Sequence, residues 1–79
     1  MTRVLARAFA PRVRVNSIAP GLIMKSSNTS EGEWHNLVSK LPVQRTGTTD
    51  ELGITLEFLI TNEYITGQTI VVDGGYSLL

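Results

Sequence analysis

The spacing of apolar residues divides the chain into helical and extended segments. Val4, Leu5, Ala8 and Phe9 recur at helical intervals, which predicts the last turns of a helix over residues 1–10. Pro11 ends this helix, because the residue before a proline is disfavoured in the helical conformation. The helix therefore leads directly into an extended segment.

Two strands are expected, one early and one late in the chain. Residues 13–18 alternate apolar and polar side chains, with Val13 and Val15 set against Arg14 and Asn16, as in a half-buried strand. The Ala-Pro-Gly sequence at 19–21 ends it. The second strand covers residues 68–73, and its run of three apolar residues predicts burial on both faces. Two glycines then turn the chain into an apolar tail.

A loop and two helices separate the strands. After the loop at 22–30, Ser30 and Glu33 have the spacing of a capping box, which predicts a short amphipathic helix over residues 31–40. A connector at 43–48 has its expected turn at Gly47. A second capping box, Thr48 with Glu51, begins a helix that runs to about residue 60. The apolar side of that helix is formed by Leu52, Leu56, Leu59 and Ile60.

The order helix, strand, helix, helix, strand indicates an α/β fold in which a helical crossover joins two parallel strands. Two parallel strands are unstable alone, because each needs both faces and both edges covered. We therefore expect residues 1–79 to form part of a larger parallel sheet that is incomplete as an independent domain.

The composition limits the number of domains and the classes of ligand and partner that we expect. With 79 residues, the chain holds at most one domain. It has no cysteine and one histidine, His35, which excludes disulfides and argues against a metal site. Seven basic and seven acidic residues give no net charge, which argues against nucleic acid or a membrane surface as partner. We expect a soluble cytoplasmic protein, and we interpret the arginines from Arg3 to Arg14 as solvated.

Three motifs together resemble the C-terminal third of the short-chain dehydrogenase/reductases. They are RVRVNSIAPG at 12–21, PVQRTG at 42–47 before an acidic-capped helix, and YITGQTIVVDGGYSL at 64–78. They occur in the family's order along the whole chain. The resemblance implies the C-terminal segment of a single Rossmann-type domain with a doubly wound parallel sheet. It also implies an NAD(P)-dependent oxidoreductase that transfers hydride to a carbonyl or pterin-type substrate.

The resemblance implies a cofactor-binding turn as well. Ligands of such sheets lie beyond the carboxyl ends of the strands. There Pro20 and Gly21 correspond to the wall beside the nicotinamide, and the backbone of Leu22 and Ile23 corresponds to the part that holds its carboxamide. The cofactor is NADP or NAD, with NADPH favoured.

Residues 22–41 correspond to the family's substrate-binding loop and small helix, with Met24, Trp34 and Leu37 as candidate substrate contacts. Met24 and Lys25 stand where many members carry a cofactor-binding threonine, so Lys25 is either a phosphate contact or a solvated side chain. Trp34 also fits a simple helix anchor, and His35 is expected to be exposed on the polar side.

The spacing from Trp34 to Arg45, with the ending DGGYSL, is similar to the pteridine reductase branch. That branch implies NADPH-dependent reduction of a pterin or folate, as in dihydropteridine or dihydromonapterin reductases. The 3-oxoacyl-carrier-protein reductases share the Asp-Gly-Gly ending and stay open as an alternative. The family also implies a small-molecule substrate and a homo-oligomer formed through the C-terminal helix and strand.

Neither a G-x-x-x-G-x-G loop nor a Tyr-x-x-x-Lys pair occurs in the chain. We therefore name no catalytic residue and expect the segment to be inactive alone. Two interpretations remain open. The chain is a C-terminal piece of a reductase, or it is a non-catalytic interaction module that associates with a full-length reductase.

Overall fold

The computed structural model describes all 79 residues. It contains the helices α1 (Thr2–Phe9), α2 (Glu31–Lys40) and α3 (Thr49–Thr61), the strands β1 (Ser17–Pro20) and β2 (Thr69–Val72), and a short 3-10 helix, η1 (Tyr76–Leu78). The two strands are parallel, with Ile18 opposite Ile70. The predicted order of helices and strands and the parallel crossover are confirmed.

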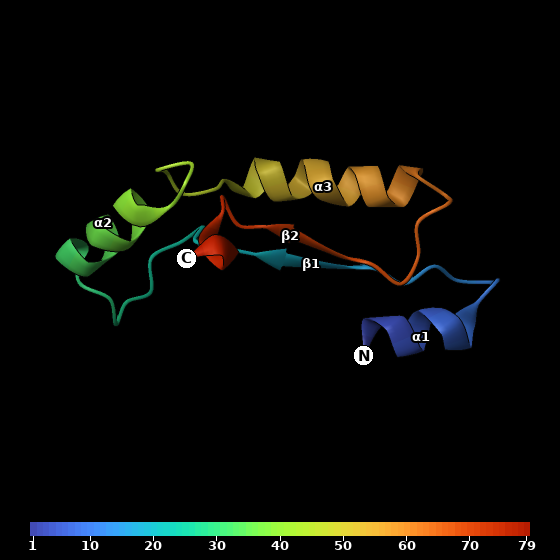
Figure 1. The fold of residues 1–79 in the computed structure, drawn as a ribbon. Coiled ribbons are helices and arrows are strands. Elements are labelled where there is room, and N and C mark those ends of the chain that lie inside the picture. Colours follow the sequence, from blue (N-terminus) through green and yellow to red (C-terminus); the bar gives the residue numbers. More distant parts are fainter.

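The helices cover the small sheet unevenly (Figure 1). α3 lies along one face, where Ile18 borders a hollow together with Leu56 and Leu59. α1 lies near the amino ends of the strands and is tied to β1 by a hydrogen bond from Thr2 Oγ1 to Ser17 Oγ of 3.1 Å. α2 lies beyond the carboxyl ends of both strands (Figure 1). The loop after β1 therefore leaves the sheet at the end that faces α2.

β1 is shorter than predicted and begins four residues later. Before Ser17, the chain is held to the opposite segment partly through side chains rather than by a regular ladder. The Val15 N–H donates to Thr66 Oγ1 at 3.1 Å. The Asn16 amide donates to Ile65 O at 3.0 Å and accepts from the Gln68 N–H at 3.1 Å. Residues 13–16 therefore lie outside the regular strand, although the Gly67 N–H donates to Val15 O at 2.8 Å.

The prediction that the second strand is buried on both faces is wrong for this chain. β2 alternates between exposed and half-buried residues, and Val71 is 54% exposed. The reason is that α3 covers only the face that carries Ile18 and its partner Ile70. In a strand, successive side chains point to opposite faces. Val71 therefore points to the face that no helix covers along its length.

α1 also differs from its predicted packing. The buried residue is Ala6, at 4% exposure, whereas Val4 and Phe9 of the predicted apolar stripe are 66% and 52% exposed. A Cβ at Gly67 would lie 3.5 Å from the Ala6 methyl, so the helix rests on this glycine. Val4 and Phe9 consequently remain exposed.

The other two helices begin where the capping boxes predicted. Ser30 Oγ accepts from the Glu33 N–H at 3.1 Å, which is one half of the first box. In the second box both bonds form, because the Glu51 N–H donates to Thr48 Oγ1 at 3.1 Å and the Thr48 N–H donates to Glu51 Oε1 at 3.0 Å. α3 therefore has a fixed amino end at the same edge of the molecule as the loop after β1. On its predicted apolar side, Leu59 is buried, Leu52 is half-buried, and Leu56 and Ile60 are exposed.

The elements form an elongated rather than a compact body. The radius of gyration is 15.4 Å, whereas a compact domain of this length has one of about 12 Å. The chain exposes 6133 Å², and a compact monomer of this mass exposes about 4,700 Å². Only Ala6, Leu41 and Leu59 are buried. This surface is what a sheet that is incomplete on its own leaves uncovered. None of the helices combines the length and apolar character needed to span a membrane.

Candidate functional site

A small cavity of about 120 Å³ lies at the carboxyl ends of β1 and β2. The Gly21 N–H donates to Val72 O at 3.0 Å, which continues the parallel pairing past Pro20 and brings the loop after β1 beside Asp73. The cavity is bordered by Leu22, Ile23, Leu41, Val43, Arg45, Gly47, Glu51, Val72, Asp73 and Gly74. The structure thus brings the predicted cofactor residues Leu22 and Ile23 together with the connector before α3 and with the turn after β2.

Glycines permit this close assembly of backbone segments. A Cβ on Gly21 would lie 2.7 Å from Asp73 Cα, and one on Gly74 would lie 2.6 Å from Val43 Cγ2. Gly74 and Gly75 also have φ angles of +61° and +93°, which side chains disfavour. The turn predicted after the second strand is confirmed. Gly21 is required for contact with β2 rather than for a positive φ, since its φ is not in that range.

Gly47 is not at the turn that the sequence predicted. The turn lies at Pro42 and Val43, and the following Gln44 has a φ of 58°. Gly47 instead makes a close approach, because a Cβ there would lie 2.6 Å from Ile23 Cδ1. Pro42 already interrupts the chain after α2, so the change of direction occurs before the glycine is reached.

The loop after β1 is hydrogen-bonded to this connector through Leu22, whereas the backbone groups of Ile23 stay free. The Gly47 N–H donates to Leu22 O at 3.0 Å. The N–H and C=O of Ile23 make no hydrogen bond within the chain. A donor and an acceptor on the same residue are therefore available beside the cavity, while the Ile23 side chain packs on Gly47. Such a pair of backbone groups complements an amide ligand, which offers both an acceptor and a donor.

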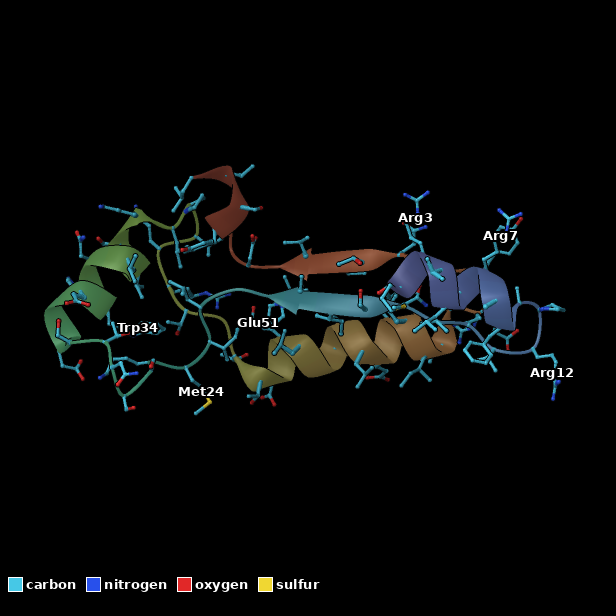
Figure 2. The ribbon with its side chains drawn as sticks, turned by 90° about the horizontal axis from the view of Figure 1, so that it is seen from below. Arg3, Arg7, Arg12, Met24, Trp34 and Glu51 are labelled. Atoms are coloured by element: carbon cyan, nitrogen blue, oxygen red, sulfur yellow. The ribbon has the colours of Figure 1, made fainter.

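An ion pair also borders the cavity. Arg45 Nη1 and Nη2 donate to the two carboxylate oxygens of Glu51, each at 2.9 Å. The hydrogen bonds from Arg45, followed by that from the Thr48 N–H, lower the pKa of Glu51 to about 2. Figure 2 shows Glu51 at the start of α3, close to the carboxyl ends of the strands. The sequence predicted Glu51 only as a capping residue and did not identify its pairing with Arg45.

Asp73 organises the turn after β2. Its carboxylate accepts from the Ser77 N–H at 2.8 Å and from the Gly75 N–H at 2.9 Å. These two hydrogen bonds, that from Ser77 foremost, lower the pKa of Asp73 below its usual value. Asp73 thereby fixes the start of η1, which forms within the predicted apolar tail.

The arrangement can bind and orient a ligand, but it offers no proton donor at neutral pH. Glu51 and Asp73 are both held ionised, because their pKa values are lowered. The tyrosines do not border the cavity, and Tyr64 is fully exposed. No group of three or more His, Asp or Glu side chains is arranged to hold a metal ion.

The predicted substrate contacts do not border the cavity. Met24 is 81% exposed and points outward from the loop (Figure 2). Trp34 is half-buried on α2, and Leu37 is 37% exposed on the same helix. The structure therefore places all three on the loop and helix beyond the strands, but does not gather them around one space.

Two further residues of this region are exposed. Lys25 Nζ donates to Thr29 O at 3.0 Å and lies 3.4 Å from Glu31 Oε1. Its charge therefore links the loop to the start of α2. His35 is exposed, as predicted.

Arg14 was wrongly interpreted as a solvated residue. Its guanidinium donates to the carbonyl oxygens of Leu59, Ile60, Asn62 and Ile65, at 2.8, 2.9, 3.0 and 3.2 Å respectively. These are orphan acceptors at the carboxyl end of α3 and just after it, where a helix lacks partners of its own. Arg14 thus holds the far end of α3 against the segment that becomes β1.

The signal for Arg14 was present in the alternation. Arg14 and Asn16 have the same parity as Ile18, which faces α3, so all three are placed on the covered face. Val13, on the opposite parity, is 51% exposed. The polar positions of this segment are therefore the inner ones. The other arginines agree with the prediction, since Arg3, Arg7 and Arg12 are exposed and point away from the ribbon (Figure 2).

Comparison with known proteins gives the chain many relatives. The family model described as Enoyl-(Acyl carrier protein) reductase matches residues 1–77. A dihydromonapterin reductase from Klebsiella pneumoniae is 37% identical over 78 residues, which cover 99% of this chain and 32% of the relative. The 3-oxoacyl-[acyl-carrier-protein] reductase FabG from Buchnera aphidicola is 45% identical over 76 residues, which cover 90% of this chain and 31% of the relative.

A solved structure is also similar to this chain. The crystal structure of FolM alternative dihydrofolate reductase 1 from Brucella suis, in complex with NADP, superposes with a TM-score of 0.92 at 46% identity. The match covers 99% of this chain and 32% of that one. The chain thus spans about a third of the length of the relatives that it matches.

Proposed function

The chain belongs to the short-chain dehydrogenase/reductase family and resembles its pteridine reductase-like branch, and from this premise we propose that it forms the nicotinamide side of an NADP(H)-dependent reductase site. In this proposal residues 1–79 are the C-terminal segment of one Rossmann-type domain. Pro20 and Gly21 form the wall beside the nicotinamide, and Leu22 and Ile23 provide the backbone that holds it.

The observation that carries the proposal is the free peptide pair of Ile23. Its N–H and C=O are unbonded within the chain and lie beside a cavity at the carboxyl ends of parallel strands, where ligands of such sheets bind. A nicotinamide carboxamide offers one acceptor oxygen and one NH₂ donor, which match these two groups. NADPH supplies a hydride when bound. The residues of this chain bind and orient the ring that carries the hydride.

The close contact of Gly21 with Asp73 fixes the loop after β1 against the turn after β2. A Cβ on Gly21 would lie 2.7 Å from Asp73 Cα, so the two segments come this close because Gly21 has no side chain. The contact supports the proposal because Leu22, the next residue, borders the cavity together with Asp73. NADP is favoured over NAD, since the Brucella suis relative at 46% identity is described in complex with NADP.

Residues 22–41 supply the substrate side in this proposal. Met24, Trp34 and Leu37 provide apolar contacts in this proposal, and Met24 is the most exposed of the three. A pterin-type substrate is favoured because the Klebsiella pneumoniae and Brucella suis relatives are a dihydromonapterin reductase and an alternative dihydrofolate reductase. A 3-oxoacyl substrate carried by a protein is the alternative, given the FabG relative at 45% identity.

The proton for the reduced substrate comes, in this proposal, from residues outside these 79. The carboxylates that border the cavity have lowered pKa values and do not donate protons near neutral pH. The glycine-rich phosphate loop and the catalytic Tyr-Lys pair of the family likewise belong to other residues. The chain on its own is therefore expected to be inactive.

A second function is favoured by the exposed surface. The chain exposes 6133 Å², about 1,400 Å² more than a compact monomer of this mass. A standard protein interface covers about 800 Å² on each partner, so the excess is large enough for one such interface. A non-catalytic module that associates with a full-length reductase would cover it, as would a homo-oligomer through α3 and β2.

A chimera tests the reductase proposal. Residues 1–79 replace the matching third of the Brucella suis FolM protein, and NADPH binding and NADPH oxidation with dihydrofolate are measured against the parent. We expect binding and turnover to persist, with Ile23→Pro, which deletes the N–H, weakening NADPH binding. A folded chimera that does not bind NADPH would contradict the proposal. Isolated chain that copurifies with a reductase without adding turnover would favour the interaction module.

A further inference from the structure

Gly47 contacts the proposed cofactor loop in two independent ways. Its N–H donates to Leu22 O at 3.0 Å, and the position of its missing Cβ lies 2.6 Å from Ile23 Cδ1. Its φ is not in the left-handed region, so its backbone does not require a glycine. A side chain at this position would therefore have to displace the end of the Ile23 side chain.

The connector that carries Gly47 is fixed at the amino end of α3. The two hydrogen bonds of the capping box hold Thr48, the residue after Gly47, against Glu51. The bidentate ion pair with Glu51 holds Arg45, two residues before Gly47. Bidentate arginine–carboxylate pairs restrict geometry as well as adding energy. The loop after β1 thus rests on a segment that is anchored from both sides.

We propose that Gly47 is a positioning residue that selects the Ile23 peptide as the nicotinamide-binding group. This inference rests on the proposed function. The Gly47 N–H occupies Leu22 O, while the N–H and C=O of Ile23 are free. The peptide groups of Met24 are also free, but Met24 does not border the cavity. By lacking a side chain, Gly47 lets Ile23 pack against the connector, which fixes the direction of that pair. The effect reaches the ligand only through Ile23.

A pair of substitutions that moves side-chain volume from position 23 to position 47 tests this inference in the FolM chimera described above. Gly47→Val adds three carbons where Ile23 packs, and Ile23→Ala removes three carbons from the same place, so the double variant conserves the volume. Gly47→Val is expected to raise the KM for NADPH about tenfold, because misplacing a binding group by a fraction of an ångström has effects of this order. The double variant is expected to recover a KM within about threefold of the starting chimera.

A matched control distinguishes the effect of replacing Gly47 from the general effect of replacing any glycine. Gly53→Ala lies on α3, and a Cβ there meets nothing within 4 Å, so its KM for NADPH is expected to stay unchanged. If Gly47→Val does not fold, Gly47→Ala carries the same test. Its partner is then Ile23→Val, which deletes the Cδ1 atom that faces Gly47.

The outcomes separate this inference from the proposed function. A raised KM in the Gly47 variant that the Ile23 substitution restores, with thermal stability matched between the two, supports positioning. A Gly47 variant with unchanged KM, or a double variant impaired as much as the single one, overturns the positioning role while NADPH binding by the starting chimera still stands. A folded starting chimera that does not bind NADPH overturns the proposed function and this inference with it.

Discussion

Replacing Arg14 tests whether one side chain holds the far end of α3. Arg14→Met keeps the apolar stem but removes the guanidinium, which donates to the carbonyls of Leu59, Ile60, Asn62 and Ile65. A hydrogen bond contributes a net of about 0.5–1.5 kcal/mol, and water can rehydrate carbonyls at an exposed helix end. We therefore expect a loss of about 2–4 kcal/mol in the free energy of unfolding.

The assay is thermal unfolding of the FolM chimera, followed by circular dichroism. For a protein of roughly 250 residues each kcal/mol corresponds to about 2–4 °C, so the midpoint should fall by about 4–16 °C. Arg12→Met is the matched control, because Arg12 is exposed and points away from the ribbon (Figure 2). Arg14→Lys should be intermediate, since an ammonium keeps the charge but cannot reach several carbonyls in a fixed fork. Equal midpoints for the Arg14→Met and Arg12→Met variants would refute the reasoning.

Three further predictions concern the cavity and its borders. Because the pKa of Glu51 is lowered to about 2, its ion pair contributes stability that is present above the unfolded pKa of about 4.3 and is lost as pH falls toward 2. Glu51→Gln should remove that part of the acid dependence in a pH series of thermal midpoints, and an unchanged series would contradict the assignment. Asp73→Asn should lower the thermal midpoint at pH 7, and the difference from the unsubstituted chimera should be smaller at pH 3. The reason is that the pKa of Asp73 is lowered in the folded state, so its contribution to stability is lost on acidification. A midpoint unaffected at pH 7 would argue against the role of Asp73 in the turn. Gly21→Ala should weaken NADPH binding by about tenfold or more, measured by fluorescence titration, because the new Cβ meets the Asp73 backbone. Gly32→Ala, with open space around it, should leave binding unchanged.

The local elements of this chain could be predicted from short-range signals. Ser30 and Thr48 begin their helices where the capping spacing placed them. The parallel pairing followed from the helical crossover, and the turn after β2 from its two glycines. The caps and the turn depend on residues a few positions apart, whereas the parallel pairing of β1 with β2 followed from the order of the elements.

Long-range contacts explain what the sequence did not reveal. The alternation of residues 13–18 places Arg14 on the covered face, but nothing local identifies its partners, which are carbonyls 45–51 positions later. Gly47 resembled a turn residue, while its actual requirement comes from Ile23 in a distant segment. The both-face burial expected of β2 failed because α3 covers only one face of the sheet, which a run of apolar residues cannot reveal. Backbone groups of Ile23 have no sequence signature, since every residue carries them.

The central claim is that the Ile23 peptide in this chain holds the nicotinamide of NADPH, and isotope-edited NMR of the FolM chimera tests it most directly. The amide of Ile23 is labelled with ¹⁵N, and the protein is titrated with NADPH and, separately, with a fragment that lacks the nicotinamide, 2′,5′-ADP. We predict a large shift of the Ile23 amide with NADPH and little shift with 2′,5′-ADP. Saturation of the chimera with NADPH while the Ile23 amide does not move would contradict the claim.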